Sequence, residues 1–282
     1  MSPERARFAR IIPLCRTPVG IDAFDYALPP GAALQPGDLV RIPLRNRNTE
    51  GIVLELLEDS PFAGKARPVL DAAPLTRFGP EWVRLAQWLA RRTFQSTASI
   101  AKAWLRSLPK ALRAWETRRP ERSSEPGPIT TAWTVAPETT AIARAKSQRG
   151  RTLMLAPLAQ QAARAAAALG CPVLLSDDPK TAAAACWRAF LEADTGILVT
   201  TRVGAWLGLY ADELILLEPE NDEHKQDELA PRFDARLIAA WLHRQAGVPL
   251  FACGRKPPIH VDEAAPAIEL HPRLCIRHRH GR

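Results

Sequence analysis

Short runs of apolar residues, broken by Pro and Gly, fill the first part of the chain. Four of them, "FARIIPLC", "AFDYALP", "DLVRIPL" and "EGIVLELLE", are rich in β-favouring residues and lie between turn signals such as "PPGAALQPGD". Strands this short and closely spaced predict a small barrel or compact sheet. From Gly79 the period changes, and "GPEWVRLAQWLARRTF" places Trp82, Leu85, Ala86 and Leu89 on one helical face. A second helix, "SIAKAWLRSL", is expected to follow.

Beyond residue 130 the pattern alternates between apolar strands and helices. The expected strands are "RTLMLAP", "CPVLLSDD", "TGILVTT", "DELILLE" and "PLFACG", and the expected helices are "AQQAARAAAALG", "KTAAAACWRAFLEA" and "ARLIAAWLHRQAG". Apolar strands alternating with helices predict a doubly wound parallel sheet. The segment before them, "ETRRPERSSEPGPIT", is polar and proline-rich and reads as a linker.

The predicted fold class is therefore α/β, in four parts. Residues 1–115 form a small β-rich, barrel-like domain that ends in helices, and residues 116–130 form the linker. Residues 131–258 form the parallel-sheet domain, and residues 259–282 form a basic, irregular tail that ends in "RHRHGR".

Hydropathy and cysteine usage indicate the cellular compartment in which the protein is expected. No run of eighteen apolar residues occurs, and the start "MSPERARFAR" is not followed by an apolar stretch, so neither a membrane span nor a secretory signal is expected. The five cysteines are scattered and never form a CxxC pair, which predicts reduced thiols and no zinc site. These features favour a cytoplasmic protein with no cofactor.

The positive charge is unevenly distributed. Residues 1–115 hold 17 Lys and Arg against 10 Asp and Glu, whereas residues 131–252 hold 12 against 14. Because phosphate neutralisation dominates affinity for nucleic acids, this surplus points to a polyanion partner. A general preference for arginine over lysine is the alternative explanation, but it would not concentrate the charge in one domain.

Several spaced motifs in residues 8–113 agree in order with one known family. The motifs are "FDY" at Phe24 to Tyr26, "PG" at Pro36, "VRIP" from Val40, "GIV" from Gly51 and Lys65 before "PVLDAAPLT". In this order they resemble the 3′-DNA-binding domain of the PriA replication-restart helicases. The resemblance implies DNA, forked or 3′-ended, as the partner, with primosome or single-strand-binding proteins as further partners. With this resemblance we expect a nucleoid-associated monomer.

The same resemblance implies site residues for a DNA 3′ end. It places Phe24, Asp25 and Tyr26 with Lys65 around the terminal nucleotide: a ring can stack on a base, a carboxylate can accept a bond from a 3′-OH, and a lysine can bind phosphate. The alternative makes Phe24 and Tyr26 inward residues of a strand and Asp25 a solvated edge residue.

One residue departs from the family pattern at the same place. Arg45 replaces the glycine of the family's "V-P-F-G", where it would either crowd the nucleotide or add a phosphate contact. Arg41, Arg47 and Arg67 are the further candidates for contacts to the DNA backbone.

The second domain resembles, more faintly, the first RecA-like lobe of the same helicases. "KQDELAPRFDAR" is similar to the family's "K-Q-E-x-x-P-R-Y-x-A-R", and "LILLEPEN" to its "L-I-I-V-D-E-E-H". In that register Glu218 stands where the magnesium-binding Asp belongs, and Pro219 where the catalytic Glu belongs. Proline cannot act as a general base.

The phosphate loop is not recognisable either. No glycine occurs from Thr130 to Arg149, and Pro137 and Glu138 stand where backbone N–H groups and positive charge are needed. We therefore expect no catalytic residues, no metal site and no ATP hydrolysis, in a truncated relative of these helicases that binds DNA during replication restart. The alternatives are a helicase subunit that completes its nucleotide site with a partner, and a decaying gene product. A metal site at His224 is a minor alternative to a solvated acidic loop.

Overall fold

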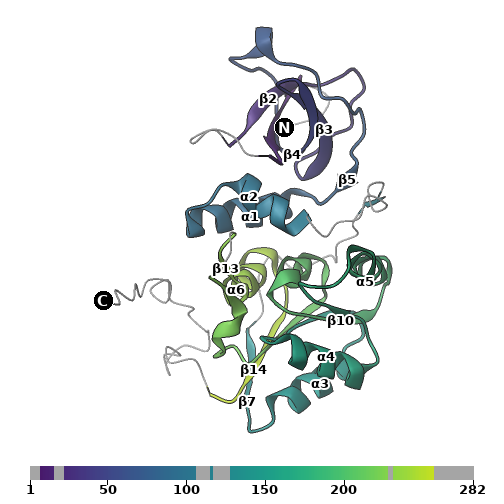
Figure 1. The fold of residues 1–282 in the computed structure, drawn as a ribbon, viewed down its shortest axis with the longest axis vertical. Helices are drawn as coiled ribbons and strands as arrows, with labels where there is room; N and C mark the ends of the chain where they lie inside the picture. Colours follow the sequence, from purple (N-terminus) through teal and green to yellow (C-terminus); the bar gives the residue numbers. More distant parts are fainter. Residues whose placement is uncertain (1–6, 16–21, 106–114, 117–127, 228–230, 257–282) are drawn as a thin grey trace, which may run out of the picture. The chain divides into compact units, whose positions relative to one another are not determined.

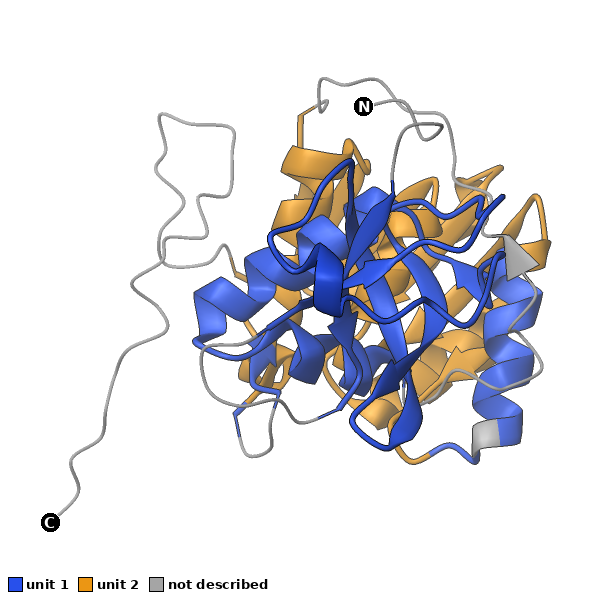
Figure 2. Ribbon diagram, turned by 90° about the horizontal axis from the view of Figure 1, so that it is seen from above, with its two compact units in different colours: residues 1–119, 178–191, 227–233 blue, residues 120–177, 192–226, 234–282 orange. Residues whose placement is uncertain are grey.

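The computed structural model describes residues 7–15, 22–105, 115–116, 128–227 and 231–256. The predicted tail 259–282 and most of the predicted linker lie outside these residues. The chain divides into two compact units, which Figure 2 distinguishes by colour. Unit 1 comprises residues 1–119, 178–191 and 227–233, and unit 2 comprises residues 120–177, 192–226 and 234–282.

Sheet A builds the first part of unit 1. Its strands are β1 (Phe8–Pro13), β2 (Phe24–Ala27), β3 (Asp38–Leu44), β4 (Arg47–Leu57), β5 (Thr76–Arg77) and β6 (Trp115–Glu116), in the order β2-β1-β4-β3-β5-β6. The strands β1 to β4 pair antiparallel. The four longer strands confirm the four β-rich runs of the sequence, and Figure 1 shows β2, β3 and β4 curled around a common centre.

The segment after β4 closes this sheet into a barrel. The N–H of Ala27 in β2 donates to the carbonyl of Arg67, and Val69 N–H donates back to Ala27. Leu70 N–H then donates to the carbonyl of Arg41 in β3. Because β2 and β3 stand on either side of the β1–β4 pair, a segment bonded to both joins the two edges. Alternate residues of a strand face the enclosed core, as Ala9 and Ile11 do in β1 and Val40 and Ile42 do in β3.

Two helices complete the described part of residues 1–119. Helix α1 (Pro80–Thr93) begins at a proline and buries Trp82, Leu85, Ala86 and Leu89, the four residues that the helical period selected. Helix α2 (Thr97–Leu105) packs against it through Trp104, whose ring meets that of Trp82 edge-on with centroids 5.5 Å apart. These tryptophans are therefore core residues.

Sheet B forms the centre of unit 2. Its strands are β7 (Thr130–Trp133), β8 (Arg151–Leu155), β9 (Val173–Leu174), β10 (Gly196–Thr200), β11 (Glu213–Leu217) and β14 (Leu250–Gly254), in the order β7-β14-β11-β8-β10-β9. All neighbouring strands are parallel. The connecting helices are α3 (Pro137–Ser147), α4 (Ala159–Leu169), α5 (Lys180–Glu192) and α6 (Ala235–Ala246), of which α5 is grouped with unit 1.

Alternate residues of the central strands face different helices. Met154, Ile215 and Phe251 share one apolar cluster with Ala141 of α3 and Ala165 of α4. Their neighbours point to the other face, which α6 and the 3₁₀ helix η4 (Arg202–Tyr210) cover. Figure 1 shows α3 and α4 together on one side of the sheet and α6 on the other. Burial on both faces explains why these strands are apolar without alternation.

The mixed α/β fold, with a β-rich first part and a parallel sheet covered by helices, confirms the predicted fold class. Elements without a periodic signal were not predicted: the short strands β5, β6, β7, β12 (Lys225–Gln226) and β13 (Phe233–Asp234), the 3₁₀ helices η2 (Ala63–Lys65) and η5 (Asp222–His224), and η4. The predicted linker begins on the last residue of β6 and ends on the first of β7. Among the described helices, none is long and apolar enough to cross a membrane.

Candidate nucleic-acid interface

The carboxylate of Asp25 lies at the centre of a buried polar network. Asp25 stands opposite Arg10 in the β1–β2 register. Arg10 donates from Nε to Oδ1 at 2.8 Å and from Nη2 to Oδ2 at 3.3 Å, and the Ser60 hydroxyl donates to Oδ2 at 2.7 Å. The Asp25 side chain is only 2% exposed. Burial opposes its ionisation, but the hydrogen bonds from Arg10 and Ser60 outweigh burial and lower the pKa of Asp25.

The network continues from Ser60 to an exposed turn. Ser60 Oγ accepts a hydrogen bond from the N–H of Phe62 at 3.1 Å, and η2 follows directly with Lys65 as its last residue. Phe62 is 61% exposed and Lys65 is exposed too. Asp25 therefore helps to hold a turn that presents an aromatic ring and a cation to solvent. Sequence reasoning missed Phe62, although an aromatic residue inside the polar, Gly- and Pro-containing stretch "DSPFAGKARP" was a usable signal.

Phe24 and Tyr26 turn toward the barrel. Tyr26 is 3% exposed, and its hydroxyl donates to the carbonyl of Pro43 at 3.3 Å. Burial raises the pKa of Tyr26 to about 12. Phe24 is half-buried and packs against the same core. The rings of Phe24 and Tyr26 face inward, as the alternative interpretation of the sequence expected. The same interpretation made Asp25 a solvated edge residue, whereas its side chain is buried and hydrogen-bonded.

Arg45 occupies the first position of the two-residue turn between β3 and β4. Leu44 pairs with Arg47 across this turn, and Arg45 has φ 54°, the left-handed conformation that favours glycine. The Arg45 carbonyl accepts a hydrogen bond from Arg67 Nη1 at 2.7 Å. The turn thus keeps the backbone conformation typical of glycine while its side chain adds an exposed cation.

Replacing Arg45 with glycine is expected to raise the free energy of unfolding by about 1 kcal/mol, because a left-handed conformation costs a residue with a Cβ about that much. Chemical denaturation with hydrogen exchange on the β3–β4 hairpin would measure the change. Arg47→Gly is the matched control, since Arg47 lies in a strand where glycine is unfavourable, and this variant should be destabilised. A fall in stability for Arg45→Gly as well would contradict the strain assigned to this turn.

The other cations predicted to contact DNA differ in whether their side chains are already paired with carboxylates of this chain. Arg41 forms a forked ion pair with Asp71, from Nε to Oδ1 at 3.0 Å and from Nη2 to Oδ1 at 2.5 Å. It borders a cavity of about 340 Å³ that Glu50 also lines, so a carboxylate faces any ligand there. Arg47, like Lys65, is exposed, and within the described residues neither has an ion-pair partner. Of the cations predicted to contact DNA, Arg45, Arg47, Lys65 and Arg67 are thus exposed and without an ion-pair partner among the described residues.

Glu218 directly follows β11, at the carboxyl end of the strands of sheet B. The resemblance placed it where the magnesium-binding carboxylate was expected. Glu218 is 8% exposed and has φ 47°. Its Oε2 accepts from Gln161 Nε2 at 3.0 Å, and its Oε1 lies 3.6 Å from Arg255 Nε. The N–H of Arg255 donates to Glu220 Oε1 at 2.7 Å. Within the described residues, the Glu218 carboxylate is therefore engaged by groups of this chain.

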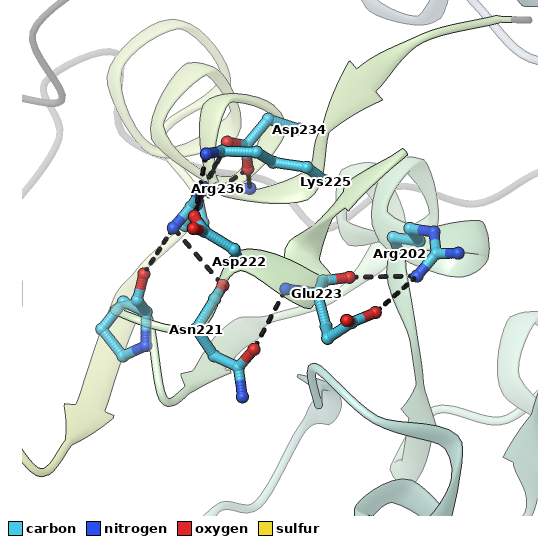
Figure 3. Close-up of polar contacts among 8 residues, drawn as sticks. Arg202, Asn221, Asp222, Glu223, Lys225, Asp234 and Arg236 are labelled. Atoms are coloured by element: carbon cyan, nitrogen blue, oxygen red, sulfur yellow. Dashed lines mark hydrogen bonds and ion pairs between the residues drawn. The ribbon is translucent and has the colours of Figure 1, made fainter. Parts of the chain in front are cut away.

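Arg236 organises the loop that follows Glu218 (Figure 3). Its guanidinium donates two hydrogen bonds to Asp234, from Nε to Oδ1 at 2.9 Å and from Nη2 to Oδ2 at 2.8 Å. Nη1 donates to the carbonyl of Pro219 at 3.0 Å, and Nη2 lies 3.5 Å from Asp222 Oδ1. Arg236 is the last residue of the "PRFDAR" motif, so this motif shapes the loop.

His224, the minor metal candidate, is a buried structural residue. It is fully buried, and its Nε2 lies 2.8 Å from the carbonyl oxygen of Leu217. Burial lowers the pKa of His224 to about 4. Among the described residues, no group of three or more His, Cys, Asp or Glu is placed to hold a metal ion.

The connection from β7 to α3 is short and lacks glycine. It consists of Thr134, Val135 and Ala136, and Val135 is 94% exposed. Helix α3 then begins at Pro137, whose carbonyl accepts a hydrogen bond from the Cys253 thiol at 3.3 Å. Glu138 in the first turn pairs with Arg164 of α4 at 2.8 Å. A three-residue connection offers few N–H groups for wrapping a triphosphate.

Comparison with known proteins bears on unit 1. Residues 16–106 match the family model of the 3′DNA-binding domain (3′BD) of PriA. A stretch of 70 residues is 37% identical to the replication restart protein PriA of Synechocystis sp., and it covers 24% of this chain and 8% of that protein. The match to that relative thus spans under a tenth of its length, and the family model spans about a third of the chain. Residues 16–106 are therefore similar to the 3′ DNA-binding domain of PriA.

Proposed function

We propose that the protein binds DNA at forks or free 3′ ends during replication restart, without hydrolysing ATP or unwinding DNA. The observation that carries this proposal is the match of residues 16–106 to the 3′ DNA-binding domain of PriA. Hydrogen bonds also bring exposed cations of this part of the chain onto neighbouring turns. Arg67 is bonded to the Arg45 turn and, through Ala27, to β2. Lys65 lies two residues before Arg67, on the turn that Ser60 and Asp25 hold.

In this proposal the exposed groups contact the DNA and the buried ones position them. The ring of Phe62 stacks on the terminal base, while Lys65 and Arg67 bind the last phosphates. Asp25 acts through Ser60, because its own side chain is 2% exposed and already accepts bonds from Arg10 and Ser60. Arg45 adds a phosphate contact at the neighbouring turn.

The proposed lack of ATP hydrolysis is supported by the edge of sheet B. Nucleotides bind in open α/β sheets at the carboxyl ends of the strands, where a loop wraps the phosphates and a carboxylate holds magnesium. Here the connection after β7 has three residues, and Glu218 is engaged by Gln161 and Arg255. Pro219 follows at the position that a general base would need. Primosome or single-strand-binding proteins are the partner proteins that fit this role.

The proposal is tested by comparing affinities for forks that end in a 3′-OH and in a 3′-phosphate. We expect the wild-type protein to prefer the 3′-OH end by about tenfold, because a phosphate on the terminal sugar would crowd the base that stacks on Phe62, and such stacking is worth about 1–3 kcal/mol per base. Lys65→Ala is expected to weaken binding to the 3′-ended fork several-fold. Lys102→Ala, an exposed lysine of α2 in the same unit, is the matched control.

Equal affinity for both ends, unchanged by Lys65→Ala or Asp25→Ala, would remove the 3′-end mechanism. ATP turnover is measured on the same protein preparation with and without the fork. No DNA-stimulated hydrolysis is expected. Hydrolysis that rises with DNA would favour the alternative, a helicase subunit that obtains its missing phosphate loop from a partner.

A further inference from the structure

The corner between α1 and α2 exposes an aromatic ring on a strained backbone. Phe94 follows the last residue of α1, is 96% exposed, and has φ 53° and ψ 42°. Glycine or asparagine normally takes this left-handed position at the end of a helix, because a bulky side chain there costs about 1 kcal/mol or more. A single exposed apolar residue is ordinary, but a bulky ring that is both strained and uncovered gains nothing within the described fold.

Two free arginines stand directly before this ring. Arg91 and Arg92 occupy the last turn of α1, are exposed, and have no ion-pair partner within the described residues. Earlier on the same helix, Arg84 pairs with Glu81 at 2.7 Å. Cations at a helix C-terminus stabilise the helix dipole, which accounts for part of this arrangement but not for the ring beside them.

The corner is held in place by the next residue. Gln95 donates from Nε2 to the carbonyl of Arg232 at 2.8 Å, and its Oε1 accepts from the N–H of Arg232 at 3.0 Å. Both residues belong to unit 1. The N–H of Gln95 also closes the end of α1 on the carbonyl of Ala90 at 2.9 Å. The ring is therefore presented by a fixed backbone, and little ordering entropy is lost when a ligand meets it.

We propose that this corner, residues 91–94, is a second DNA contact of unit 1 that binds single-stranded DNA away from any strand end. Phe94 stacks on an unpaired base, and Arg91 and Arg92 bind the flanking phosphates. Stacking on an exposed ring beside free cations is the chemistry by which single strands are held without sequence preference. The site adds to the proposed function, since it needs no 3′ terminus.

The test uses a covalently closed circle of single-stranded DNA, which has no ends, and measures affinity by fluorescence anisotropy. Phe94→Asn is expected to weaken binding about tenfold, because one base loses its stacking partner. Asparagine tolerates the left-handed backbone, so this variant keeps or gains stability and the weaker binding cannot come from misfolding. Phe94→Trp is expected to retain the affinity. The double variant Arg91→Gln/Arg92→Gln should lower the slope of log affinity against log salt by about 0.7 for each phosphate that an arginine no longer neutralises.

Arg84→Gln is the matched control on the same helix and should leave affinity for the circle within twofold of wild type. Unchanged affinity in Phe94→Asn and in the double arginine variant would overturn the proposal. So would a variant that leaves DNA binding intact but abolishes self-association of the chain, since the corner would then be a protein contact. The ratio of affinities for 3′-OH and 3′-phosphate forks should not change in these variants, so failure here and failure of the 3′-end mechanism are distinguishable.

Discussion

Replacing Arg236 with alanine is expected to lower the free energy of unfolding of unit 2 by about 3–5 kcal/mol, the range for breaking a buried ion pair by removing one partner. The side chains of Arg236 and Asp234 are each 12% exposed. Removing the guanidinium leaves the Asp234 carboxylate largely buried and takes away the donor to the Pro219 carbonyl. Burial opposes the charge of Arg236, but its hydrogen bonds to Asp234 raise the pKa of Arg236 overall.

Hydrogen exchange on peptides from β11 and α6 is the measurement, because it reports on unit 2 without interference from unit 1. Lys225→Ala is the matched control. Lys225 pairs with Asp222 at 2.8 Å in the same loop, but the Asp222 side chain is 81% exposed, so removing that pair should cost at most about 1 kcal/mol. Arg236→Lys should recover only part of the stability, since an ammonium cannot bind the carboxylate through two parallel bonds. Equal exchange rates in Arg236→Ala and Lys225→Ala would contradict the role given to Arg236.

The elements that the sequence predicted well are those whose burial leaves a period. The helix period of α1 selected its buried face because one stripe of that helix meets the core and the other meets water. Helix α4 ends at Gly170, which has φ 64°, as the glycine after an alanine-rich run predicted. The strands of sheet B were recognisable because both faces are covered. By contrast, η4 is buried along most of its length and carries no alternation that would separate a 3₁₀ helix from a strand.

The candidate site was predictable in its residues but not in its geometry. The motif around Asp25 pointed to the correct domain, but the partners of Asp25 lie 15 and 35 residues away in the chain, at Arg10 and Ser60. No local pattern announces such pairs, because strand register brings them together. The conformation of Phe94 was equally hidden, since propensity favours glycine there and the sequence offers a phenylalanine. Such local conflicts are where function or strain is expected.

The second large effect is expected for Asp25→Asn, which should lower the free energy of unfolding of unit 1 by about 2 kcal/mol at neutral pH, within the range for hydrogen bonds to charged groups. The cost is smaller than for Arg236→Ala because the Arg10 side chain is 37% exposed and keeps its contact to Glu55 at 2.7 Å. Glu55→Gln is the matched control: it removes the other carboxylate of the same arginine, but the Glu55 side chain is 48% exposed, so about 0–1 kcal/mol is expected.

This difference between wild type and Asp25→Asn should depend on pH in one direction. The hydrogen bonds hold the pKa of Asp25 in the folded protein below its ordinary value of 3.8. A depressed carboxylate pKa contributes stability that is complete above the unfolded pKa and is lost as the pH falls through the folded pKa. The gap between the two proteins should therefore be constant above about pH 5 and shrink below about pH 4. The measurement is the difference in free energy of unfolding between the two proteins at each pH. Hydrogen exchange on peptides from β1 and β2 gives this difference near neutral pH, and chemical denaturation gives it at low pH.

A gap that widened on acidification would mean that the carboxylate is protonated in the folded protein, in conflict with its bonds to Arg10 and Ser60. The same variant also separates structure from recognition. If Asp25 acts through Ser60 on the turn at Phe62, Asp25→Asn should reduce protection of residues 60–65 and weaken 3′-end binding together. Loss of 3′-end binding with unchanged protection of that turn would instead place the DNA terminus directly on the carboxylate.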